Sequence, residues 1–402
     1  MAHNERDGAI VKGAAQVATN EGLAFGVLGP LQMRVAGTEV PLGTPKQRAV
    51  LAMLVINRNR PVGIESLLGA AWGQCPPSGA RASLHSYVSS LRRLIGSTGL
   101  DARTALVSAP PGYRLRASEI DCDIGRFVIE KNAGVQAAAA AHFETASRHF
   151  AAALAEWRGP VLEDLRDFSF VDPFATALTE DKLYVHTARA EAEIVCGRWY
   201  AVIAELQGLI IEHPYHEPLW AQLITAYYLS ERQSDALDAY GRLKAILADD
   251  LGIDPGPTVQ ELHARILRQD PLDVKKAAQR TAARAVTSLQ QRTTVHGGSA
   301  IAQLVDASGR RYPLTAAATT IGRLADNDIV LDDASVSRHH AVVIDTGTNW
   351  VITDLRSANG VKLRQQRIRG TATLADGDRI GIGGHELTFE IPPPETELPD
   401  SV

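Results

Sequence analysis

The sequence is poor in cysteine and contains no long apolar run. Its 402 residues include three cysteines, Cys75, Cys122 and Cys196, which are far apart and show no C-x-x-C spacing. A disulfide framework or a thiolate zinc site is therefore not indicated, and we expect buried or chemically idle thiols. No stretch offers the roughly 20 apolar residues of a membrane span, and the first 22 residues lack the apolar run of a signal peptide. We expect a cytoplasmic protein without membrane insertion.

Several enzyme motifs are also missing. The stretch "GTPKQR" lacks the glycine spacing with which a phosphate loop surrounds a nucleotide. Neither G-x-S-x-G nor H-E-x-x-H occurs. A catalytic triad assembled from distant residues stays open on this evidence, but we expect a protein that is not an enzyme and that has no cofactor and no metal site.

Charge divides the chain into modules. Residues 23–116 carry 11 basic and 3 acidic side chains, net +8, whereas residues 119–270 carry 13 basic and 25 acidic ones, net −12. Residues 300–391 are nearly neutral, with 10 basic and 11 acidic groups. A cationic module beside an anionic one indicates binding to nucleic acid, because neutralising phosphates supplies most of the sequence-independent affinity. A merely solvated basic face is the alternative.

The remaining segments connect or flank these modules. Residues 271–299, rich in Ala, Thr, Ser and Gln, are predicted to be a linker. Residues 1–22 are predicted to be disordered, and residues 392–402 form a proline-rich acidic tail. At roughly 150 residues per domain, the length fits two to three domains. We therefore expect a multidomain α+β protein.

The basic module is predicted to combine short strands, three helices and a final hairpin. "FGVLGPLQMRVAGTEVPL" alternates apolar and polar residues, and "TPKQRAVLAMLVINRN" starts a helix with Thr44 as N-cap and Pro45 in its first turn. The helix in "SGARASLHSYVSSLRRLIG" has an apolar face from Leu84 to Ile95 and an opposite face of Arg, His and Ser. "ALVSAPPGYRLRA" predicts a hairpin wing. This is the pattern of a winged helix-turn-helix.

These phrases, in this order, resemble the OmpR-type winged helix of the antibiotic-regulatory class of actinobacterial transcription activators. The resemblance implies that the third helix enters the major groove. By this resemblance, base edges are contacted by Arg81, His85, Ser86 and Ser89, and phosphates by Arg92, Arg93 and the wing residue Arg114.

Residues 121–270 are predicted to be all-helical. "EPLWAQLITAYYLSERQSDALDAYGRLK" has the offsets of a tetratricopeptide-type helix pair, and Val202 and Leu206 stand 34 residues before Ala236 and Tyr240. Such pairs stack into a surface for protein partners. "EWRGPVLEDL" and "LGIDPGPTVQELHARIL" are similar to the bacterial transcriptional activation domain that follows the winged helix in the same class.

Residues 300–391 are predicted to form an all-β sandwich, since short strands alternate with Asp, Asn and Gly turns. Polar residues gather in three loops, which contain Gly322-Arg323, "SRHH" from Ser337 to His340, and Asn359-Gly360. This order resembles the forkhead-associated domain without departure at its defining positions. By this resemblance, phosphothreonine is bound by Arg323, Ser337, Arg338 and Asn359, with support from Gly322, His340 and Gly360.

The chemistry of these residues suits a phosphorylated side chain. Such a group carries roughly −1.5 to −2 charges and three acceptor oxygens, so it requires cations and donors that converge from loops. The adjacent residues His339 and His340 suggest a metal site as an alternative. Adjacent residues of a strand point to opposite faces, however, and no carboxylate or thiol pattern completes a site.

Together, the three modules resemble those members of the class that carry a forkhead-associated domain. The resemblance implies a transcription activator that docks an autophosphorylated membrane Ser/Thr protein kinase, binds double-stranded promoter DNA as head-to-tail copies on direct repeats, and acts with RNA polymerase. It also implies cell-wall arabinosyltransferase genes as targets. Two alternatives stay open, a phosphopeptide-binding adaptor without sequence-specific DNA binding and an enzyme within the helical module.

Overall fold

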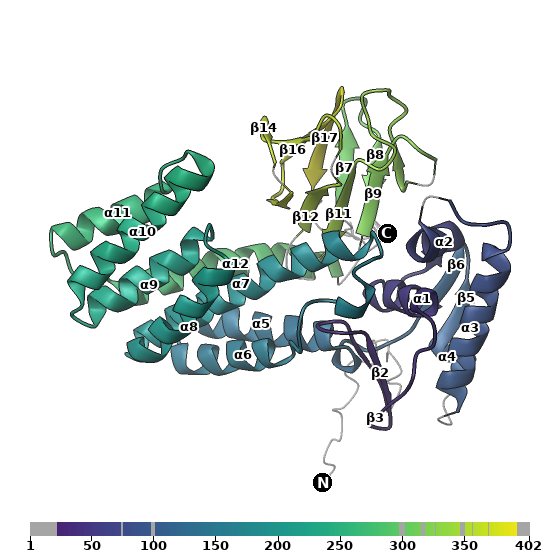
Figure 1. Cartoon of the computed structure of the whole chain (residues 1–402), viewed down its shortest axis with the longest axis horizontal. Helices are drawn as coiled ribbons and strands as arrows, with labels where there is room; N and C mark the ends of the chain where they lie inside the picture. The colour runs from purple at the N-terminus through teal and green to yellow at the C-terminus, as the bar shows by residue number, and fades with distance from the viewer. Residues whose placement is uncertain are drawn as a thin grey trace, which may run out of the picture.

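Three modules follow one another in the chain (Figure 1). The structure is a computed structural model, and it describes residues 22–73, 75–97, 101–296, 302–314, 318–325, 327–345, 350–355, 357–368 and 370–391. The predictions on residues 1–21 and 392–402 lie outside the described residues. The winged helix, the helical module and the β-sandwich occur in the predicted order, which confirms the predicted fold class.

The winged-helix module has a hairpin, three main helices and a wing. Its elements are β1 (Leu23–Gly26), β2 (Gln32–Val35), β3 (Thr38–Glu39), α1 (Pro45–Ile56), β4 (Val62–Gly63), α2 (Ile64–Trp72), α3 (Ala80–Gly96), α4 (Ala102–Ala105), β5 (Leu106–Ala109) and β6 (Gly112–Leu115). The wing sheet has the order β4-β6-β5. Thr44 caps α1 as predicted, and its side chain accepts a hydrogen bond from the Gln47 amide. The apolar face of α3 lies in the core, where Leu84, Val88 and Leu91 are buried.

The helical module is a succession of packed helices. Its elements are η1 (Glu119–Asp121), α5 (Asp123–Ala139), α6 (Phe143–Ala155), η2 (Glu163–Leu165), α7 (Val171–Val195), α8 (Trp199–Glu212), α9 (Glu217–Leu229), α10 (Gln233–Leu251), α11 (Pro257–Leu267) and α12 (Val274–His296). Val202 and Leu206 of α8 and Ala236 of α10 are buried, and Tyr240 packs against the same core. The helices related by 34 residues therefore bury equivalent positions, as the repeat pattern predicts.

The predicted linker is wrong in one respect. Most of residues 271–299 form the helix α12, which packs against α5 and α7 instead of only spanning two domains. Ala278 and Ala282 are 3 % and 5 % exposed and belong to the same core as the winged helix. Their spacing of four residues places both on one helix face, and their small side chains allow close approach of the helices. The packing of α12 against α5 and α7 could not be predicted from the sequence, because the small alanine side chain gives little hydrophobic signal.

The C-terminal module is a sandwich of two sheets. Its elements are β7 (Gln303–Asp306), β8 (Arg311–Pro313), β9 (Ala318–Gly322), β10 (Ile329–Val330), β11 (Ala341–Asp345), β12 (Trp350–Asp354), β13 (Val361–Leu363), β14 (Gln366–Arg367), β15 (Thr371–Leu374), β16 (Arg379–Ile382) and β17 (His385–Glu390). The strand orders are β10-β9-β11-β12-β15 and β14-β13-β16-β17-β7-β8. Apolar side chains from both sheets, among them Ile321, Val343 and Phe389, fill the space between them.

The sandwich also packs against the helical module. Strand β11 is buried on both faces, because Ala341 and Val343 enter the sandwich core while Val342 and Ile344 join the core shared with α7. Val351 of β12 belongs to this shared core as well. The outward face of the five-stranded sheet is therefore an apolar contact surface between domains.

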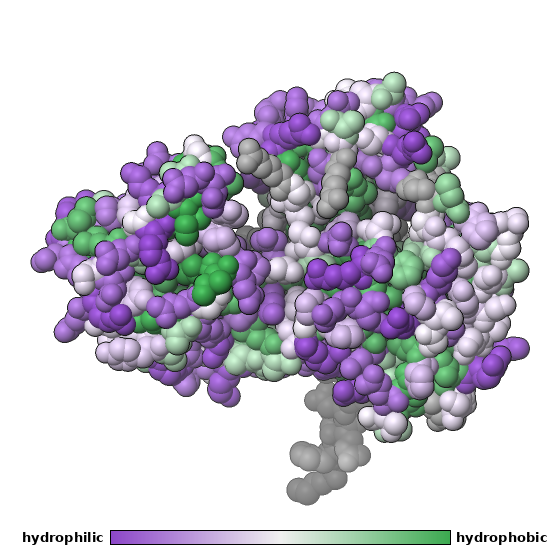
Figure 2. Space-filling model, viewed as in Figure 1, coloured by the Kyte–Doolittle hydropathy of each residue, from purple (hydrophilic) through white to green (hydrophobic). Residues whose placement is uncertain are grey.

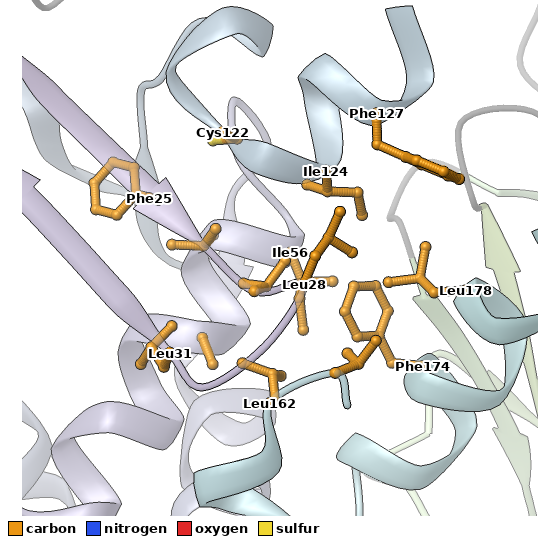
Figure 3. Packing of buried hydrophobic residues seen from close by; sticks show 14 of the residues in the cluster. Phe25, Leu28, Leu31, Ile56, Cys122, Ile124, Phe127, Leu162, Phe174 and Leu178 are labelled. Carbon is orange, nitrogen blue, oxygen red and sulfur yellow. The ribbon is translucent and has the colours of Figure 1, made fainter. Parts of the chain in front are cut away.

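The winged helix and the helical module share an apolar core. In Figure 3, Leu28 of the N-terminal hairpin lies close to Ile124 of α5 and Phe174 of α7, and Phe25 and Leu31 of the same hairpin belong to the same core. The surface seen in Figure 2 is largely hydrophilic, with green apolar patches that interrupt it over the helical module.

Two carboxylates, the buried Asp123 and the half-buried Asp164, join these modules by hydrogen bonds. Asp123, at the start of α5, accepts hydrogen bonds from the amides of Val27 and Leu28 at 2.9 Å and from Arg158 at 3.1 Å. Asp164 accepts from the Leu31 amide at 2.8 Å and pairs with Arg48 of α1 at 2.7 Å. A buried amide without a partner is costly, so these contacts fix the hairpin on the helical module.

Candidate functional site

The three polar loops of the sandwich come together at one place. The Arg323 amide donates to the Ser337 carbonyl at 3.0 Å, which joins the first loop to the second. The Ala358 amide donates to Ser337 Oγ at 3.1 Å, and Asn359 Nδ2 donates to the Ser335 carbonyl at 2.7 Å, which joins the second loop to the third. The structure thus brings together the residues that the sequence assigns to one site.

Two cations at this site have exposed side chains. Arg323 and Arg338 are both exposed, and Arg323 Nε makes only a long contact of 3.3 Å with the Val336 carbonyl. Within the described residues neither guanidinium has a carboxylate partner. Two arginines without a carboxylate partner among the described residues, together with a serine hydroxyl, suit a dianionic ligand, because charge-assisted bonds to phosphate are stronger than bonds between neutral groups.

His340 supports the loops from inside. Its side chain is 0 % exposed, and its Nδ1 accepts a hydrogen bond from the Ser337 amide at 3.0 Å. An Nδ1 that accepts leaves the proton on Nε2, which lies 3.1 Å from the Gly360 carbonyl and donates to it. The imidazole therefore ties the second loop to the third, which agrees with the predicted supporting role.

The two glycines have different reasons for lacking a side chain. Gly360 has φ of 75°, a conformation that favours glycine. At Gly322 the constraint is space, because a Cβ would overlap the Arg338 carbonyl and would lie 2.8 Å from both amide atoms of Asn327. Backbone conformation thus accounts for Gly360, whereas Gly322 allows a close backbone approach.

Asn327 is a further buried polar residue of the site, and no sequence motif indicated it. This side chain is 6 % exposed, and its Nδ2 donates to the carbonyls of Leu324 and Arg338 at 2.9 and 2.8 Å. Its Oδ1 lies 3.1 Å from His339 Nδ1. Asn327 therefore joins the backbone at Arg338 to that at Leu324, the residue after Arg323, and an asparagine just before a short apolar strand was the available signal.

The metal alternative gains no support. His339 and His340 point to different surroundings, the first toward Asn327 and the second into the interior. In the parts of the chain that the structure describes, no group of three His, Cys, Asp or Glu side chains is arranged to hold a metal ion.

The exposed face of α3 carries the residues assigned to DNA. Arg81, His85, Ser86, Ser89 and Arg93 are exposed, whereas Arg92 and Arg114 are partly buried. The hydroxyls of Ser86 and Ser89 donate to carbonyls four residues earlier in the helix, at 3.1 and 2.8 Å. Arg81 forms an exposed ion pair with Glu65 of α2.

Two of these residues, Arg92 and His85, also contact the wing. Arg92 Nε donates to the Leu106 carbonyl at 2.9 Å, Arg92 Nη2 donates to Ser108 Oγ at 3.0 Å, and the guanidinium lies 5.7 Å from the Tyr113 ring centre. His85 Nδ1 lies 2.6 Å from the Tyr113 hydroxyl. Helical periodicity does not show that the wing packs against α3 at His85 and Arg92. From the sequence, both side chains were therefore predicted to be free to contact DNA. Arg92 thus holds α3 against the wing, and its predicted contact with DNA phosphates stays a prediction.

Arg114 lies on the wing strand β6 between two buried neighbours, Tyr113 and Leu115. Its Nε is buried without a hydrogen-bond partner among the described residues. It faces away from the core of the wing, and the predicted phosphate contact stays a prediction.

Burial shifts the pKa of side chains such as Glu191 and Cys122 in the described part of the helical module, and no catalytic arrangement of side chains accompanies them. Burial raises the pKa of Glu191 to about 8, and this side chain lines a cavity of about 120 Å³ with Gln222, Arg265 and Asp273. Gln222 Nε2 donates to Glu191 Oε1 at 3.2 Å. Burial also raises the pKa of Cys122 to about 12, which leaves this thiol unreactive. Among the described helices, none is long and apolar enough to cross a bilayer.

Three family models match the chain in the order of its modules. They are "Transcriptional regulatory protein, C terminal" over residues 37–115, "Bacterial transcriptional activator domain" over residues 122–267 and "FHA domain" over residues 319–383. The matched domains are regulatory, so the chain is not an enzyme.

Individual relatives agree with these models. The transcriptional regulatory protein EmbR of Mycobacterium tuberculosis is 67 % identical over 379 residues, covering 94 % of this chain and 98 % of the relative. The transcriptional regulatory protein MoaR1 of the same species is 50 % identical over 262 residues, covering 65 % of this chain and 84 % of the relative. A solved structure of Mycobacterium tuberculosis EmbR in complex with a low-affinity phosphopeptide superposes with a TM-score of 0.91, covering 94 % of this chain and 99 % of the other. The chain therefore belongs to the EmbR family of transcriptional regulators, with a DNA-binding winged helix and a phosphopeptide-binding forkhead-associated domain.

Proposed function

We propose that this chain is a transcription activator controlled by a phosphorylated Ser/Thr protein kinase that docks on its forkhead-associated domain. The observation that carries the proposal is the convergence of three hydrogen-bonded loops on two exposed arginines. In this proposal Arg323, Ser337 and Arg338 bind the phosphate, and Asn359 binds the backbone of the kinase segment.

The geometry favours a phosphorylated ligand over an unphosphorylated one. The phosphate would receive hydrogen bonds from charged donors, each stabilising by about 1.5 to 3 kcal/mol. Without the phosphate, several such bonds are lost together and two cations stay without a partner. Threonine is favoured over serine by the resemblance, since the family senses the methyl group.

The output of the proposed regulator is promoter binding by the winged helix. The cationic charge of residues 23–116 and the exposed Arg81 and Arg93 on α3 support a contact with duplex DNA. Head-to-tail copies would occupy direct repeats about one helical turn apart, roughly 10 to 10.5 base pairs. RNA polymerase as partner and cell-wall arabinosyltransferase genes as targets belong to the same proposal, which rests on similarity to EmbR.

Calorimetry tests the first half of the proposal. A peptide from a kinase activation loop is titrated into the full chain in three forms, with threonine, phosphothreonine and phosphoserine. We expect at least about a hundredfold preference for phosphothreonine over threonine, with phosphoserine between them, because several charge-assisted bonds are lost at once. Equal affinity for the first two forms would overturn the phosphate-binding role.

Gel shifts on arabinosyltransferase promoter fragments test the second half. We expect retardation that weakens steeply with salt and a second shifted band when a direct repeat is complete. A parallel series with the phosphothreonine peptide shows whether docking changes DNA affinity. Phosphopeptide binding without any sequence-dependent DNA binding would favour the adaptor alternative.

A further inference from the structure

One exposed arginine lies directly against the third phosphate-site loop. Arg367 is on β14, and a Cβ at Gly360 would lie 2.7 Å from its Cζ and 2.8 Å from its Nη2. Its guanidinium thus rests on the backbone of the residue that follows Asn359. His340 Nε2 donates a hydrogen bond to the Gly360 carbonyl. The backbone that Arg367 contacts is therefore held in place from the protein interior.

A second cation stands beside it. Lys362 of β13 is the register partner of Arg367 in the β13–β14 pair, so both side chains project from the same face. That face is the outer one, because Val361 and Leu363 on either side of Lys362 are buried. Like charges directly opposite each other destabilise a sheet. The pair of Lys362 and Arg367 is therefore better explained by a binding role than by a contribution to stability.

Other arginines of the same sheet differ. Arg364 pairs with Asp378 at 2.6 Å, and Arg379 pairs with Glu386 at 3.6 Å. Within the described residues, neither Arg367 nor Lys362 has an acidic partner. Among the described residues, Arg364 and Arg379 thus have acidic partners, whereas Arg367 and Lys362, which border the third loop, have none.

We propose that Arg367, assisted by Lys362, selects phosphopeptides that carry an acidic side chain close to the phosphothreonine. The inference rests on the proposed phosphothreonine binding and adds a specificity-determining residue to it. A peptide whose backbone is held by Asn359 passes next to Gly360, and a Glu or Asp near the phosphothreonine then faces the Arg367 guanidinium. A Lys or Arg at the same place meets two cations and is disfavoured.

The expected selectivity is modest because both cations are exposed. Exposed ion pairs correspond to about a 1.5- to 5-fold change in affinity, and a network of two cations lies toward the upper end. We therefore expect the wild-type chain to prefer a Glu-containing phosphopeptide over its Gln-containing counterpart by about 2- to 5-fold at low salt. The preference shrinks at higher ionic strength, since salt screens exposed charges.

Calorimetry on the full chain with matched phosphothreonine peptides tests this inference. Glu, Gln or Lys replaces one residue at a time, up to three positions on either side of the phosphothreonine. The Arg367→Gln variant is expected to bring the Glu-to-Gln affinity ratio to about 1, and Arg367→Glu to reverse it in favour of Lys. The Arg379→Gln variant removes the same charge from the same sheet at a paired site, and it should keep the wild-type ratio.

The outcomes separate the inference from the function beneath it. A wild-type chain that binds phosphothreonine peptides tightly but shows no acidic preference at any position overturns only the role of Arg367. The role of Arg367 would also be overturned if Arg367→Gln lowered the affinity for the Glu-containing and the Gln-containing phosphopeptides equally. The arginine would then only support the backbone at Gly360. If the wild-type chain binds phosphorylated and unphosphorylated peptides with equal affinity, both the proposed function and this inference are wrong.

Discussion

The two recognition surfaces differ in how much of their polar chemistry is already used inside the protein. On α3, Arg92 and His85 contact the wing, and the hydroxyls of Ser86 and Ser89 bond to their own helix. In the forkhead-associated loops, backbone groups, His340, the Ser337 hydroxyl and the Asn359 amide make internal bonds, while the guanidinium groups of Arg323 and Arg338 are exposed.

This difference has a physical origin. A phosphate site requires fixed geometry around one small dianion, so internal bonds hold its loops in place while the two guanidinium groups stay exposed. A DNA surface depends on many phosphate contacts and tolerates side chains that are released from internal partners on binding. Substitutions should therefore have concentrated effects in the loops and distributed effects on α3.

The largest effect is expected for Arg323→Ala. Loss of a charge-assisted bond of about 1.5 to 3 kcal/mol should raise the Kd for a phosphothreonine peptide by about 10- to 150-fold. The measurement is calorimetry, and promoter affinity in a gel shift should stay at the wild-type level. A change below twofold in peptide affinity would mean that phosphate binding is distributed over many contacts of the loops, as DNA binding is over α3.

The Gly360→Ala variant should destabilise the third loop. Its φ of 75° and the overlap with the Arg367 side chain each disfavour a Cβ, with a combined cost on the order of 1 to 3 kcal/mol. Gly309→Ala is the matched control, because Gly309 has φ of 83° but no heavy atom within 4 Å of a Cβ. Thermal melts should separate the two variants. Equal loss in both would show that φ alone matters and that Arg367 moves aside freely.

On α3, Arg92→Ala and Arg93→Ala should behave differently. Removing Arg92 breaks hydrogen bonds to Leu106 and Ser108, so it should cost about 1 kcal/mol of stability. Arg93 is exposed, and its removal should leave the melting temperature unchanged while lowering the slope of log affinity against log salt by about 1. Melting curves and salt-dependent gel shifts on both variants are the test. An identical salt slope in wild type and Arg93→Ala would remove this residue from the phosphate contacts.

The smallest effect is expected for Ser86→Ala combined with Ser89→Ala. Because both hydroxyls donate to carbonyls of α3 itself, the double variant should change stability by less than about 0.5 kcal/mol and promoter affinity by less than about threefold. Competition gel shifts against the wild type measure this. A loss above tenfold would show that the hydroxyls rotate onto base edges, as the sequence alone suggested.

The sequence was most informative where a backbone arrangement demands particular residue types. Ser337, His340 and Asn359 occur in a fixed order because their bonds join three loops, and this order identified the site. The amphipathic face of α3 was equally visible, since burial follows the helical period.

Contacts between modules were not visible in the sequence. Asp123 looks like an ordinary helix-start residue, yet it binds amides of a hairpin 95 residues earlier. The alanines of α12 give no strong apolar period, and strand β11 shows its second contact face only as an unbroken apolar run. Such contacts depend on which surfaces meet in three dimensions, and short-range patterns contain little information on that.

The bonds of Asp123 and Asp164 also limit how this protein could be recombined with its relatives. A chimaera joined between residues 116 and 121 would place a foreign helical module under the hairpin, and both carboxylates would have to be supplied by the donor. Winged helix and helical module should therefore be exchanged as a pair to keep promoter choice intact. The forkhead-associated domain meets the rest through an aliphatic face that includes Val342, Ile344 and Val351 and through an ion pair between Asp345 and Arg60, so an exchange of this domain alone requires compensating changes at the apolar face and at one ion pair.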